Sequence, residues 1–550
     1  MGTGSYCNSM ISLCDALRSG CAPIKVINML HFSFKKVNFA SHVKNVRLIS
    51  NVRSSNGDQN TCETDKPMSF EEIPGPTSYP IIGTLHKYMP FFGEYDAETL
   101  DKNSWLNWRR YGSLVREEPG VRLLHVFDPE DIEVVFRQDH RYPSRRSHVA
   151  MLHYRLSKPH VYNTGGLLST NGPEWWRLRS TLQKNFTSPQ SVKSHISYTD
   201  IVVQEFLQWI KEKNVSHDED FLPYLNRLNL EVIGTVAFNE QFHGFTEQEQ
   251  DRNSRTSKII DAAFGSNSGI MKLDKGFLWR IFETPLYRKL ATSQEFLEKV
   301  SRDILLERAN FFASDKNDDN SLLASFLKQS NLDMKDILGM MVDILMAAID
   351  TTSYATSFAL YHISRNLEVQ KKIFDEIIEH LPTKDTHITA EILSKLVYTK
   401  GCIKESLRLN PVSIGVGRLS QKEFILKGYL IPEGTVIVTQ NMVACRLPQY
   451  VRDPLAFKPE RWIRGSEGYE NLHPFLSLPF GFGPRSCIAR RLAEQNMCIA
   501  IVRLIREFQI EWKGGELGIR TLLINKPDKP VSLSFTSRKR VDSLHNDVPF

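Results

Sequence analysis

The chain has 550 residues, more than one ordinary hydrophobic core usually serves, so we expect either several domains or one large helical fold. Hydrophobic residues make up 41% of it and charged residues 24%, which is typical of a globular protein and excludes a disordered or fibrous one. The net charge of +6 is modest, and no basic stripe interleaved with aromatic residues is found in the sequence, so we predict no nucleic-acid partner.

The first 65 residues differ in composition from the rest of the chain. Between residues 1 and 57 the sole acidic residue is Asp15, whereas lysines, arginines and serines are frequent. This composition is typical of an organelle transit peptide; a disordered tail without a targeting function is the alternative. The apolar patches fall short of the roughly 18 residues that a membrane-spanning helix needs. We predict that residues 1–65 are a mitochondrial transit peptide with a flexible lead-in, and that residues 66–550 form the folded body.

Proline and glycine are dense between Glu71 and Gly83, which marks the start of the folded body. Beyond this point helical periodicity dominates as far as about Leu409. The clearest helical patterns cover residues 174–186, 201–213, 295–313 and 334–366. Strand-like alternation is confined to short pieces, such as residues 423–431 and 435–441. The sequence therefore predicts a mainly α fold with small β-sheets.

The segment 334–366 is longer than most globular helices and almost uncharged in its middle, so we expect it to run through the interior. Asp350 and Thr351 stand in this apolar span. Burying a carboxylate costs several kilocalories per mole unless it has a partner or a task. An acid beside an alcohol in an apolar helix therefore indicates a site that handles protons.

The stretch PFGFGPRSCIARR, residues 479–491, predicts a ligand-binding loop. Gly481 and Gly483 allow a sharp turn and a close approach to a flat ligand. Cys487 stands where a helix is expected to begin, and a helix N-terminus stabilises a thiolate. One thiolate cannot complete a tetrahedral zinc site, but it can be the single protein ligand of a haem iron.

Four residues of this loop, Phe480, Gly483, Arg485 and Cys487, resemble the haem-binding signature of the cytochromes P-450. Ala489 stands where that family usually has glycine. The resemblance implies one large, mainly α domain over residues 66–550, with haem b buried between the long central helix and the cysteine loop. It also implies that Cys487 is the thiolate ligand of the haem iron.

Further motifs of the family follow in the expected order. Glu405 and Arg408 match its Glu-x-x-Arg pair, and Arg461 in FKPERW completes a buried network with them behind the haem. Alone, the first pair would be interpreted as a solvated ion pair on a helix. With the cysteine loop downstream, the resemblance implies a structural role for all three.

The resemblance also implies which side chains bind the haem propionates. In EWWRLR, residues 174–179, Trp175 and Arg179 match a helix of the family that contributes to this site. Arg418 and Arg485 match two further guanidinium positions, and planar guanidinium groups pair well with carboxylates. A core aromatic residue and surface salt bridges are the alternative interpretations of these residues taken singly.

The segment MAAIDTT, residues 346–352, resembles the oxygen-activation motif of the family, with Ala348 in place of the usual glycine. The resemblance implies that Asp350 and Thr351 deliver protons during dioxygen activation, which favours monooxygenation. The alternative for Thr351 is a hydrogen bond to a carbonyl of its own helix.

The electron donor implied by the resemblance is a small acidic, adrenodoxin-like mitochondrial ferredoxin with its NADPH-dependent reductase. Four basic residues match positions where mitochondrial members are basic, namely Lys400, Lys404, Arg490 and Arg491. Such a cluster attracts an acidic partner. We therefore expect the matrix side of the mitochondrion, with peripheral association with the inner membrane as a further expectation.

Three segments, residues 142–155, 161–179 and 487–497, resemble arthropod mitochondrial steroid hydroxylases of moulting-hormone synthesis. This likeness implies hydroxylation of a sterol intermediate, at carbon 22 of an ecdysteroid precursor. The alternatives are another mitochondrial sterol or xenobiotic hydroxylase, a non-catalytic haem or sterol carrier, and a helical protein without haem, the last because of Ala348 and Ala489. By analogy the substrate site would be shaped by residues 148–162, 345–347, 412–416 and 522–524.

Overall fold

The computed structural model describes residues 66–538 apart from residues 90, 92, 277 and 313–318. The predicted transit peptide, residues 1–65, lies outside the described residues, so it stays a prediction together with the boundary at residue 66. Within the described part of the chain the structure is mainly helical, with four small sheets. This confirms the predicted fold class.

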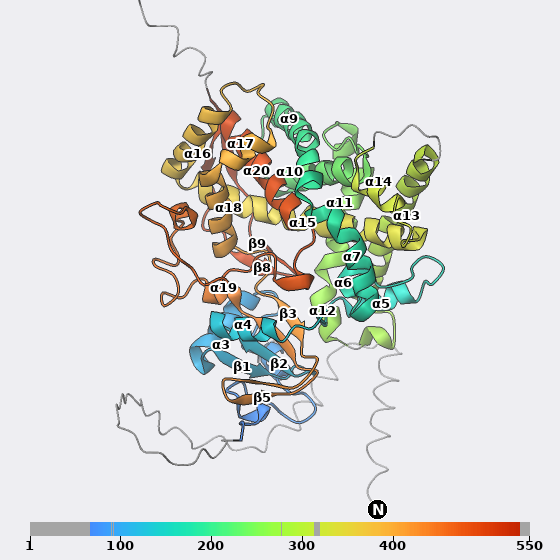
Figure 1. Cartoon of the computed structure of the whole chain (residues 1–550), viewed down its shortest axis with the longest axis vertical. Coiled ribbons are helices and arrows are strands. Elements are labelled where there is room, and N and C mark those ends of the chain that lie inside the picture. The colour runs from blue at the N-terminus through green and yellow to red at the C-terminus, as the bar shows by residue number, and fades with distance from the viewer. Residues whose placement is uncertain (1–65, 90, 92, 277, 313–318, 539–550) are drawn as a thin grey trace, which may run out of the picture. The chain divides into compact units, whose positions relative to one another are not determined.

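The helices carry most of the fold (Figure 1). In chain order they are α3 (Leu100–Tyr111), α4 (Pro129–Arg137), α5 (Val149–Leu156), α6 (Gly166–Ser169), α7 (Gly172–Thr187), α8 (Pro189–Ser194), α9 (Ile196–Lys213), α10 (Leu222–Ile233), α11 (Arg255–Ser268), α12 (Ile270–Lys275), α13 (Pro285–Phe312), α14 (Leu322–Leu327), α15 (Met334–Ser364), α16 (Leu367–His380), α17 (Ala390–Lys395), α18 (Val397–Leu409), α19 (Asn441–Ala444) and α20 (Arg490–Glu507). Short helical turns are η1 (Phe70–Glu72), η2 (Leu85–Tyr88), η3 (Gly234–Phe238), η4 (Gln248–Gln250), η5 (Leu278–Arg280), η6 (Pro459–Trp462) and η7 (Gly483–Arg485). All four predicted helical segments are confirmed.

The long helix α15 runs through the middle of the helical part, as its apolar sequence predicted (Figure 1). Its first turn is capped by Asp333, whose side chain accepts a hydrogen bond from the Asp336 N–H at 2.9 Å. Helices α10, α11, α13, α18 and α20 pack against it. Among the described residues this is the one helix long and apolar enough to cross a membrane, but it is mostly buried, so packing inside the protein accounts for its composition.

The strands are short and form separate small sheets. They are β1 (Leu114–Glu117), β2 (Leu123–Val126), β3 (Gly417–Leu419), β4 (Phe424–Leu426), β5 (Tyr429–Ile431), β6 (Val436–Thr439), β7 (Phe508–Trp512), β8 (Ile519–Thr521), β9 (Asn525–Pro527) and β10 (Leu533–Ser537). One sheet has four strands in the order β1-β2-β6-β3, with β2 and β6 parallel and the other neighbours antiparallel. The predicted strand pieces correspond to the β4–β5 hairpin and to β6, whereas the others were not predicted.

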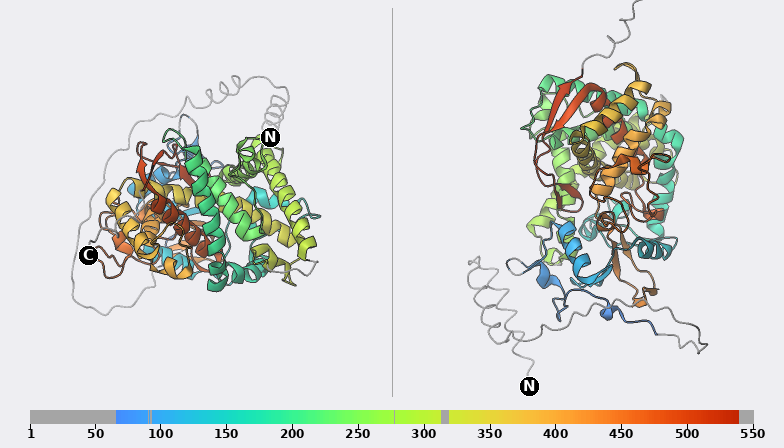
Figure 2. Two further views of the ribbon diagram at one scale, coloured as in Figure 1. Left: turned by 90° about the horizontal axis from the view of Figure 1, so that it is seen from above. Right: turned by 90° about the vertical axis from the view of Figure 1, so that its left-hand side faces the viewer.

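Two of these sheets lie at opposite ends of the helical part. Figure 2 shows the antiparallel β7–β10 ribbon near the top of its right-hand view and β1 and β2 lower down. The four-stranded sheet includes β3, which carries Arg418, and it packs its buried Leu124, Val126 and Ile437 against Val135 and Phe136 of α4. This packing holds one predicted haem-contacting residue on a rigid strand.

Candidate haem site

The loop before α20 presents the thiol of Cys487. Gly481 and Gly483 have φ angles of +73° and +69°, which residues with a Cβ atom rarely adopt. The Cys487 N–H donates a hydrogen bond to the carbonyl of Phe480 at 2.8 Å and closes the turn. Helix α20 begins at Arg490, so the thiol stands just before a helix N-terminus. The loop has the conformation that the sequence predicted.

The Cys487 thiol is accessible although protein surrounds it. Cys487 is exposed, yet burial is the strongest influence on the pKa of its thiol and raises it. The N–H of Ala489 and the charge of Arg179 act in the opposite direction and favour the thiolate. Cys487 is thus accessible although nearby protein groups act on its thiol, so the thiol is available to a ligand.

A stripe of α15 is accessible as well. Most of the helix is buried, but Ala347, Ala348, Thr351 and Thr352 are partly exposed. Their spacing puts all four on one face of the helix. Because α15 packs against α20, this accessible stripe and the cysteine loop belong to neighbouring elements. The alanine in place of the family's glycine lies on the stripe, where its small side chain still allows close approach.

Asp350 lies next to this stripe but is itself buried, with 2% of its surface exposed. Its Oδ2 accepts a hydrogen bond from Asn267 Nδ2 at 3.3 Å. Burial raises the pKa of Asp350 to about 6, against the opposing effects of Asn267 and of the charge on Lys526. A carboxyl group that titrates near neutrality can hold a proton and release it under cellular conditions.

The hydroxyl of Thr351 donates a hydrogen bond to the carbonyl of Ala347 at 2.7 Å. This is the bond within its own helix that the alternative interpretation expected. The oxygen lone pairs of Thr351 remain available on the accessible stripe, and they can accept a further hydrogen bond. Its predicted part in proton delivery stays a prediction.

Four guanidinium groups influence one another electrostatically beside the cysteine loop. They belong to Arg145, Arg179, Arg418 and Arg485, which come from four different parts of the chain. Burial and then the charges of the other three lower the pKa of Arg485 to about 8. Burial and repulsion also lower the pKa of Arg145 to about 10. These shifts show that the positive charge gathered here is poorly compensated.

The contacts of these arginines hold them in place. Arg485 donates to the carbonyl of Pro143 at 3.0 Å and lies over the ring of Trp175, 4.2 Å from its centroid. Arg179 donates to the carbonyl of Ser486 at 2.9 Å.

The remaining predicted arginine has a carboxylate partner, since the Arg418 Nε lies 2.9 Å from Asp139 Oδ1. One carboxylate does not balance four guanidinium groups, so the site fits a ligand that brings further carboxylates, as the two propionates of haem do. The donor set of thiol and arginines is therefore that of a haem site.

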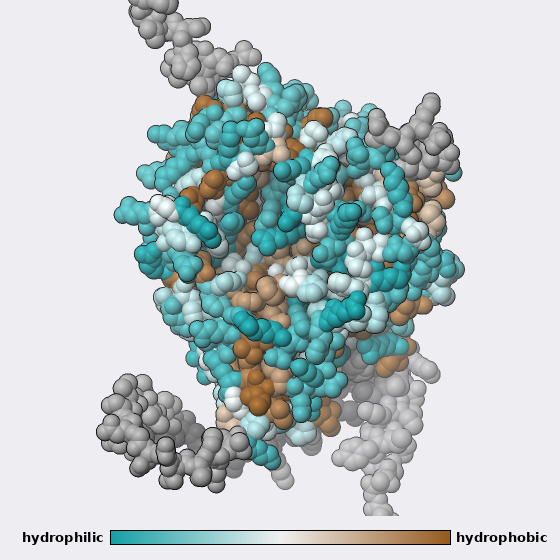
Figure 3. All heavy atoms as spheres, viewed as in Figure 1, coloured by the Kyte–Doolittle hydropathy of each residue, from teal (hydrophilic) through white to brown (hydrophobic). Residues whose placement is uncertain are grey.

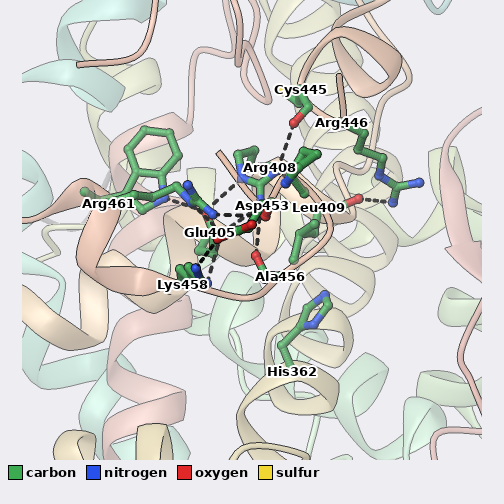
Figure 4. A network of polar contacts seen from close by, with 12 residues as sticks. His362, Glu405, Arg408, Leu409, Cys445, Arg446, Asp453, Ala456, Lys458 and Arg461 are labelled. Atoms are coloured by element: carbon green, nitrogen blue, oxygen red, sulfur yellow. Dashed lines mark hydrogen bonds and ion pairs between the residues drawn. The ribbon is translucent and has the colours of Figure 1, made fainter. Parts of the chain in front are cut away.

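A second network of polar contacts centres on Glu405 (Figure 4). Glu405 is fully buried and accepts hydrogen bonds from Arg408 at 2.7 and 2.9 Å, from Arg461 Nε at 2.9 Å and from Trp462 Nε1 at 2.8 Å. Burial opposes its ionisation, but the hydrogen bonds and charges of the two arginines prevail and lower its pKa. This network joins α18 to η6, which confirms that the three motif residues meet.

The model of the family Cytochrome P-450 matches residues 73–535, nearly all of the folded body. This chain is a cytochrome P-450. Members of the family are monooxygenases that carry haem b bound through a cysteine thiolate. Its enzyme class and cofactor follow from this membership, and the predicted resemblance is confirmed.

Relatives of this cytochrome P-450 include several proteins named mitochondrial. Mitochondrial cytochrome P-450 302a1 of Drosophila melanogaster is 43% identical over 484 residues, which cover 87% of this chain and 97% of that protein. Probable mitochondrial cytochrome P-450 301a1 of the same organism is 29% identical over 86% of this chain and 88% of its own length. Ecdysone 20-monooxygenase, also from Drosophila melanogaster, is 28% identical over 85% of this chain and 88% of its own length. The protein is thus a cytochrome P-450 of mitochondrial type.

The four predicted ferredoxin-binding residues lie on two packed helices of this cytochrome P-450, α18 and α20. Lys404 is exposed and Lys400 partly exposed. Arg490 and Arg491 are exposed in the first turn of α20, where Arg490 forms an ion pair with Glu494 at 3.2 Å. The structure therefore brings all four to neighbouring elements, although Lys404 and Arg490 lie 86 positions apart in the chain.

Sequence reasoning missed two residues of the site. Arg145 belongs to the guanidinium cluster, and Asn267 binds Asp350. Arg145 stands in a loop beside a second arginine, and Asn267 stands between two serines near the end of a helix, so no local pattern marked either. Of the predicted substrate residues, Leu345 and Met346 are fully buried in the core, and Ala347 lies on the accessible stripe.

Proposed function

We propose that this cytochrome P-450 hydroxylates a sterol intermediate of moulting-hormone synthesis, at carbon 22 of an ecdysteroid precursor, with electrons from a mitochondrial ferredoxin. The observation that carries the haem-thiolate part is the accessible Cys487 thiol beside four arginines, of which Arg418 pairs with the carboxylate of Asp139. Support for the steroid substrate comes from the segments that resemble steroid hydroxylases and from the relative named ecdysone 20-monooxygenase.

In this proposal each residue of the site has a separate task. Cys487 binds the haem iron, and Phe480 and Gly483 shape the loop that presents the thiol. The propionates are held by the predicted residues Trp175, Arg179, Arg418 and Arg485, together with Arg145. When bound, the haem supplies the redox chemistry that reduces dioxygen and inserts one of its atoms into a C–H bond.

The protein's own side chains control proton supply and exclude water. Asp350 is buried, and its pKa of about 6 lets the carboxyl group exchange a proton at a pH close to neutral. Thr351 lies on the accessible stripe, within the same helical turn, and its hydroxyl oxygen can accept a hydrogen bond from a donor on that stripe. The burial of Asp350 limits its contact with bulk water, so that protons reach the site through these groups.

The basic residues Lys400, Lys404, Arg490 and Arg491 form the proposed ferredoxin face. Positive charge at the rim of an interface mainly accelerates association with an acidic partner, and salt screens the effect. Electron transfer by this route requires no flavin in the same chain.

Two exposed apolar segments support the proposed peripheral membrane association. Ile81 and Phe91 are fully exposed, and Ile281 and Phe282 are 72% and 55% exposed. The segments lie near each other because η2, inside the first, contacts α12 just before the second through Lys275 and Tyr88. On the face drawn in Figure 3, hydrophilic side chains dominate and apolar ones gather toward the lower part. Such a surface can enter the headgroup region of a membrane without spanning it.

We further propose that residues 1–65, as transit peptide and lead-in, direct the protein to the mitochondrion, and that residues 66–550 form the enzyme. Fusion of residues 1–65 to a fluorescent protein should localise it to mitochondria, and a cytosolic fusion protein would contradict the proposal.

A substrate panel tests the proposed activity. Recombinant protein with ferredoxin, its reductase and NADPH is given ecdysteroid precursors, and the products are identified by mass spectrometry. We expect a product hydroxylated at carbon 22. Hydroxylation at another carbon, or of xenobiotic compounds alone, would instead support the alternative of a different mitochondrial hydroxylase.

A further inference from the structure

Asn267 connects two helices at the carboxyl group of Asp350. It lies in the last turn of α11 and is 6% exposed. Its Nδ2 donates to Asp350 Oδ2 at 3.3 Å and to the carbonyl of Met346 at 3.0 Å. Both hydrogens of the amide nitrogen are thereby used on α15, so the amide has one preferred orientation. Asp350 is held by a group that cannot rotate without losing a buried hydrogen bond.

Asp350 and Asn267 also line one small cavity, together with Lys526 of β9. Lys526 is partly exposed, so this wall of the cavity reaches the surface of the protein. Its Nζ lies 5.3 Å from the centroid of the Phe264 ring, which also lines the cavity. A cation–π contact of this kind holds an ammonium group beside a hydrophobic wall.

The charged and titratable groups around Asp350 are few. Lys526 acts on it through its charge and favours the carboxylate. Tyr354, one turn further along α15, has a pKa raised by burial and then by Asp350, so it stays neutral. The pKa of Lys526 itself is lowered by burial and then by the charge of Arg520, while Asp350, Asp220 and Glu98 act in the opposite direction. The net decrease eases release of a proton from its ammonium group.

We propose that Asn267 and Lys526 are positioning residues for Asp350: Asn267 fixes the carboxyl group, and Lys526 returns a proton to it from solvent across the shared cavity. The inference rests on the proposed role of Asp350 as a proton donor. After Asp350 releases its proton, the carboxylate accepts one from the Lys526 ammonium group. The neutral amine then takes a proton from bulk water, so charge is balanced and no electrons move.

The test uses two substitutions with matched controls. Asn267→Leu removes the amide but keeps the same branching of side-chain heavy atoms, and its control is Asn229→Leu. Asn229 is also buried and also donates to α15, but to Ser353 Oγ, at 2.9 Å. Lys526→Met removes the ammonium group, and its control is Lys289→Met, because Lys289 Nζ lies 5.4 Å from the same Phe264 ring.

The primary measurement is infrared titration of the purified holoenzyme. The carbonyl band of protonated Asp350 is identified as the one lost in Asp350→Asn. In the wild type we expect its midpoint near pH 6, since the pKa of Asp350 is about 6. Asn267→Leu and Lys526→Met should each raise the midpoint by about one pH unit, because each removes an influence that favours the carboxylate. Lys526→Arg should restore it, and the two controls should leave it unchanged.

The second measurement is the peroxide released per NADPH consumed. It should rise severalfold in Asn267→Leu and Lys526→Met but not in the controls, because slower proton return diverts reducing equivalents. An unchanged midpoint in both variants, or equal shifts in the controls, would overturn the inference. If Asp350→Asn itself leaves peroxide release unchanged, the proposed role of Asp350 fails, and the infrared titration still decides whether Asn267 and Lys526 control its proton. If Asn267→Leu does not fold, the infrared midpoint and the peroxide yield of Lys526→Met still test the inference, because Lys526 is partly exposed and its replacement leaves the core intact.

Discussion

Cys487 differs from the other described cysteines in exposure. Cys402, Cys445 and Cys498 are buried, and burial raises the pKa of the last two thiols to about 11 and about 12. Cys487 is accessible. The N–H of Ala489 and the guanidinium charge of Arg179 act on its thiol and favour the thiolate. Burial thus keeps three of these thiols neutral, and the cysteine loop leaves the fourth available to a metal.

Replacing Cys487 by serine should abolish thiolate ligation. We expect the reduced Cys487→Ser protein to lose the red-shifted Soret band that carbon monoxide gives with a thiolate-bound haem, because a hydroxyl group does not supply the soft anionic ligand. Cys445→Ser is the control, since its thiol donates to the Leu476 carbonyl at 3.2 Å and a hydroxyl can do the same. A red-shifted band in Cys487→Ser would refute the assignment of the ligand.

The pH dependence of stability should report the burial of Asp350. Its pKa rises from 3.8 to about 6 on folding, so the folded state binds the proton more tightly and stability falls as the pH rises from about 4 to about 6. At about 1.4 kcal/mol per unit this amounts to about 3 kcal/mol at pH 7. Asp350→Asn should remove this decrease in the free energy of unfolding with rising pH. Unfolding in urea at pH 4.5 and pH 7 measures it, and identical pH profiles for variant and wild type would show that Asp350 is not perturbed.

At the scale of the elements, α15 is fixed by a buried pair rather than by its apolar surface alone. Asp343 of α15 forms an ion pair with Arg155 of α5 at 2.8 Å, and both side chains are buried. The Leu167 N–H of α6 donates to the same carboxylate at 2.9 Å. Gly166 has a φ of +80° beside this pair. The carboxylate of Asp343 therefore joins α15 to α5 and α6. These contacts set the orientation of the accessible stripe relative to the rest of the fold.

Gly166→Ala should destabilise the protein more than the strain of an alanine at positive φ alone would. An added Cβ would lie 2.3 Å from Arg155 Nη1 and 2.4 Å from Asp343 Oδ2, so the buried pair would have to move. We expect a loss of about 3 kcal/mol, from strain at positive φ and from disturbance of the ion pair. Gly172→Ala is the matched control, because its φ is +71° but nothing lies within 4 Å of the added atom. Denaturant unfolding compares the two, and equal losses would show that crowding at Gly166 has no effect.

At the scale of the whole molecule, the charge distribution suits the proposed electron donor, an acidic ferredoxin. The net charge is only +6, yet α18 and α20 place four basic residues on packed elements. A small net charge with a local cluster gives a directed attraction to an acidic partner rather than general adhesion to anions.

Reversing one charge on this face should weaken ferredoxin binding without changing the haem site. Lys404→Glu should raise the KM for ferredoxin about fivefold or more at low ionic strength, and the difference should shrink as salt is added. Lys299→Glu on the exposed surface of α13 is the control and should behave as the wild type. Steady-state kinetics at several salt concentrations test this, and a salt-independent effect would mean that the substitution disturbs the fold.

The sequence by itself determined the features that depend on neighbours in the chain. The periodicity of residues 334–366 specified a buried helix because hydrophobic spacing is local, and the glycines around Cys487 specified the turn because φ is a property of single residues. Only the tertiary structure decided which distant groups meet. It brought Arg145 together with Arg485, and Asn267 with Asp350, because burial and packing between elements, rather than spacing along the chain, set those distances.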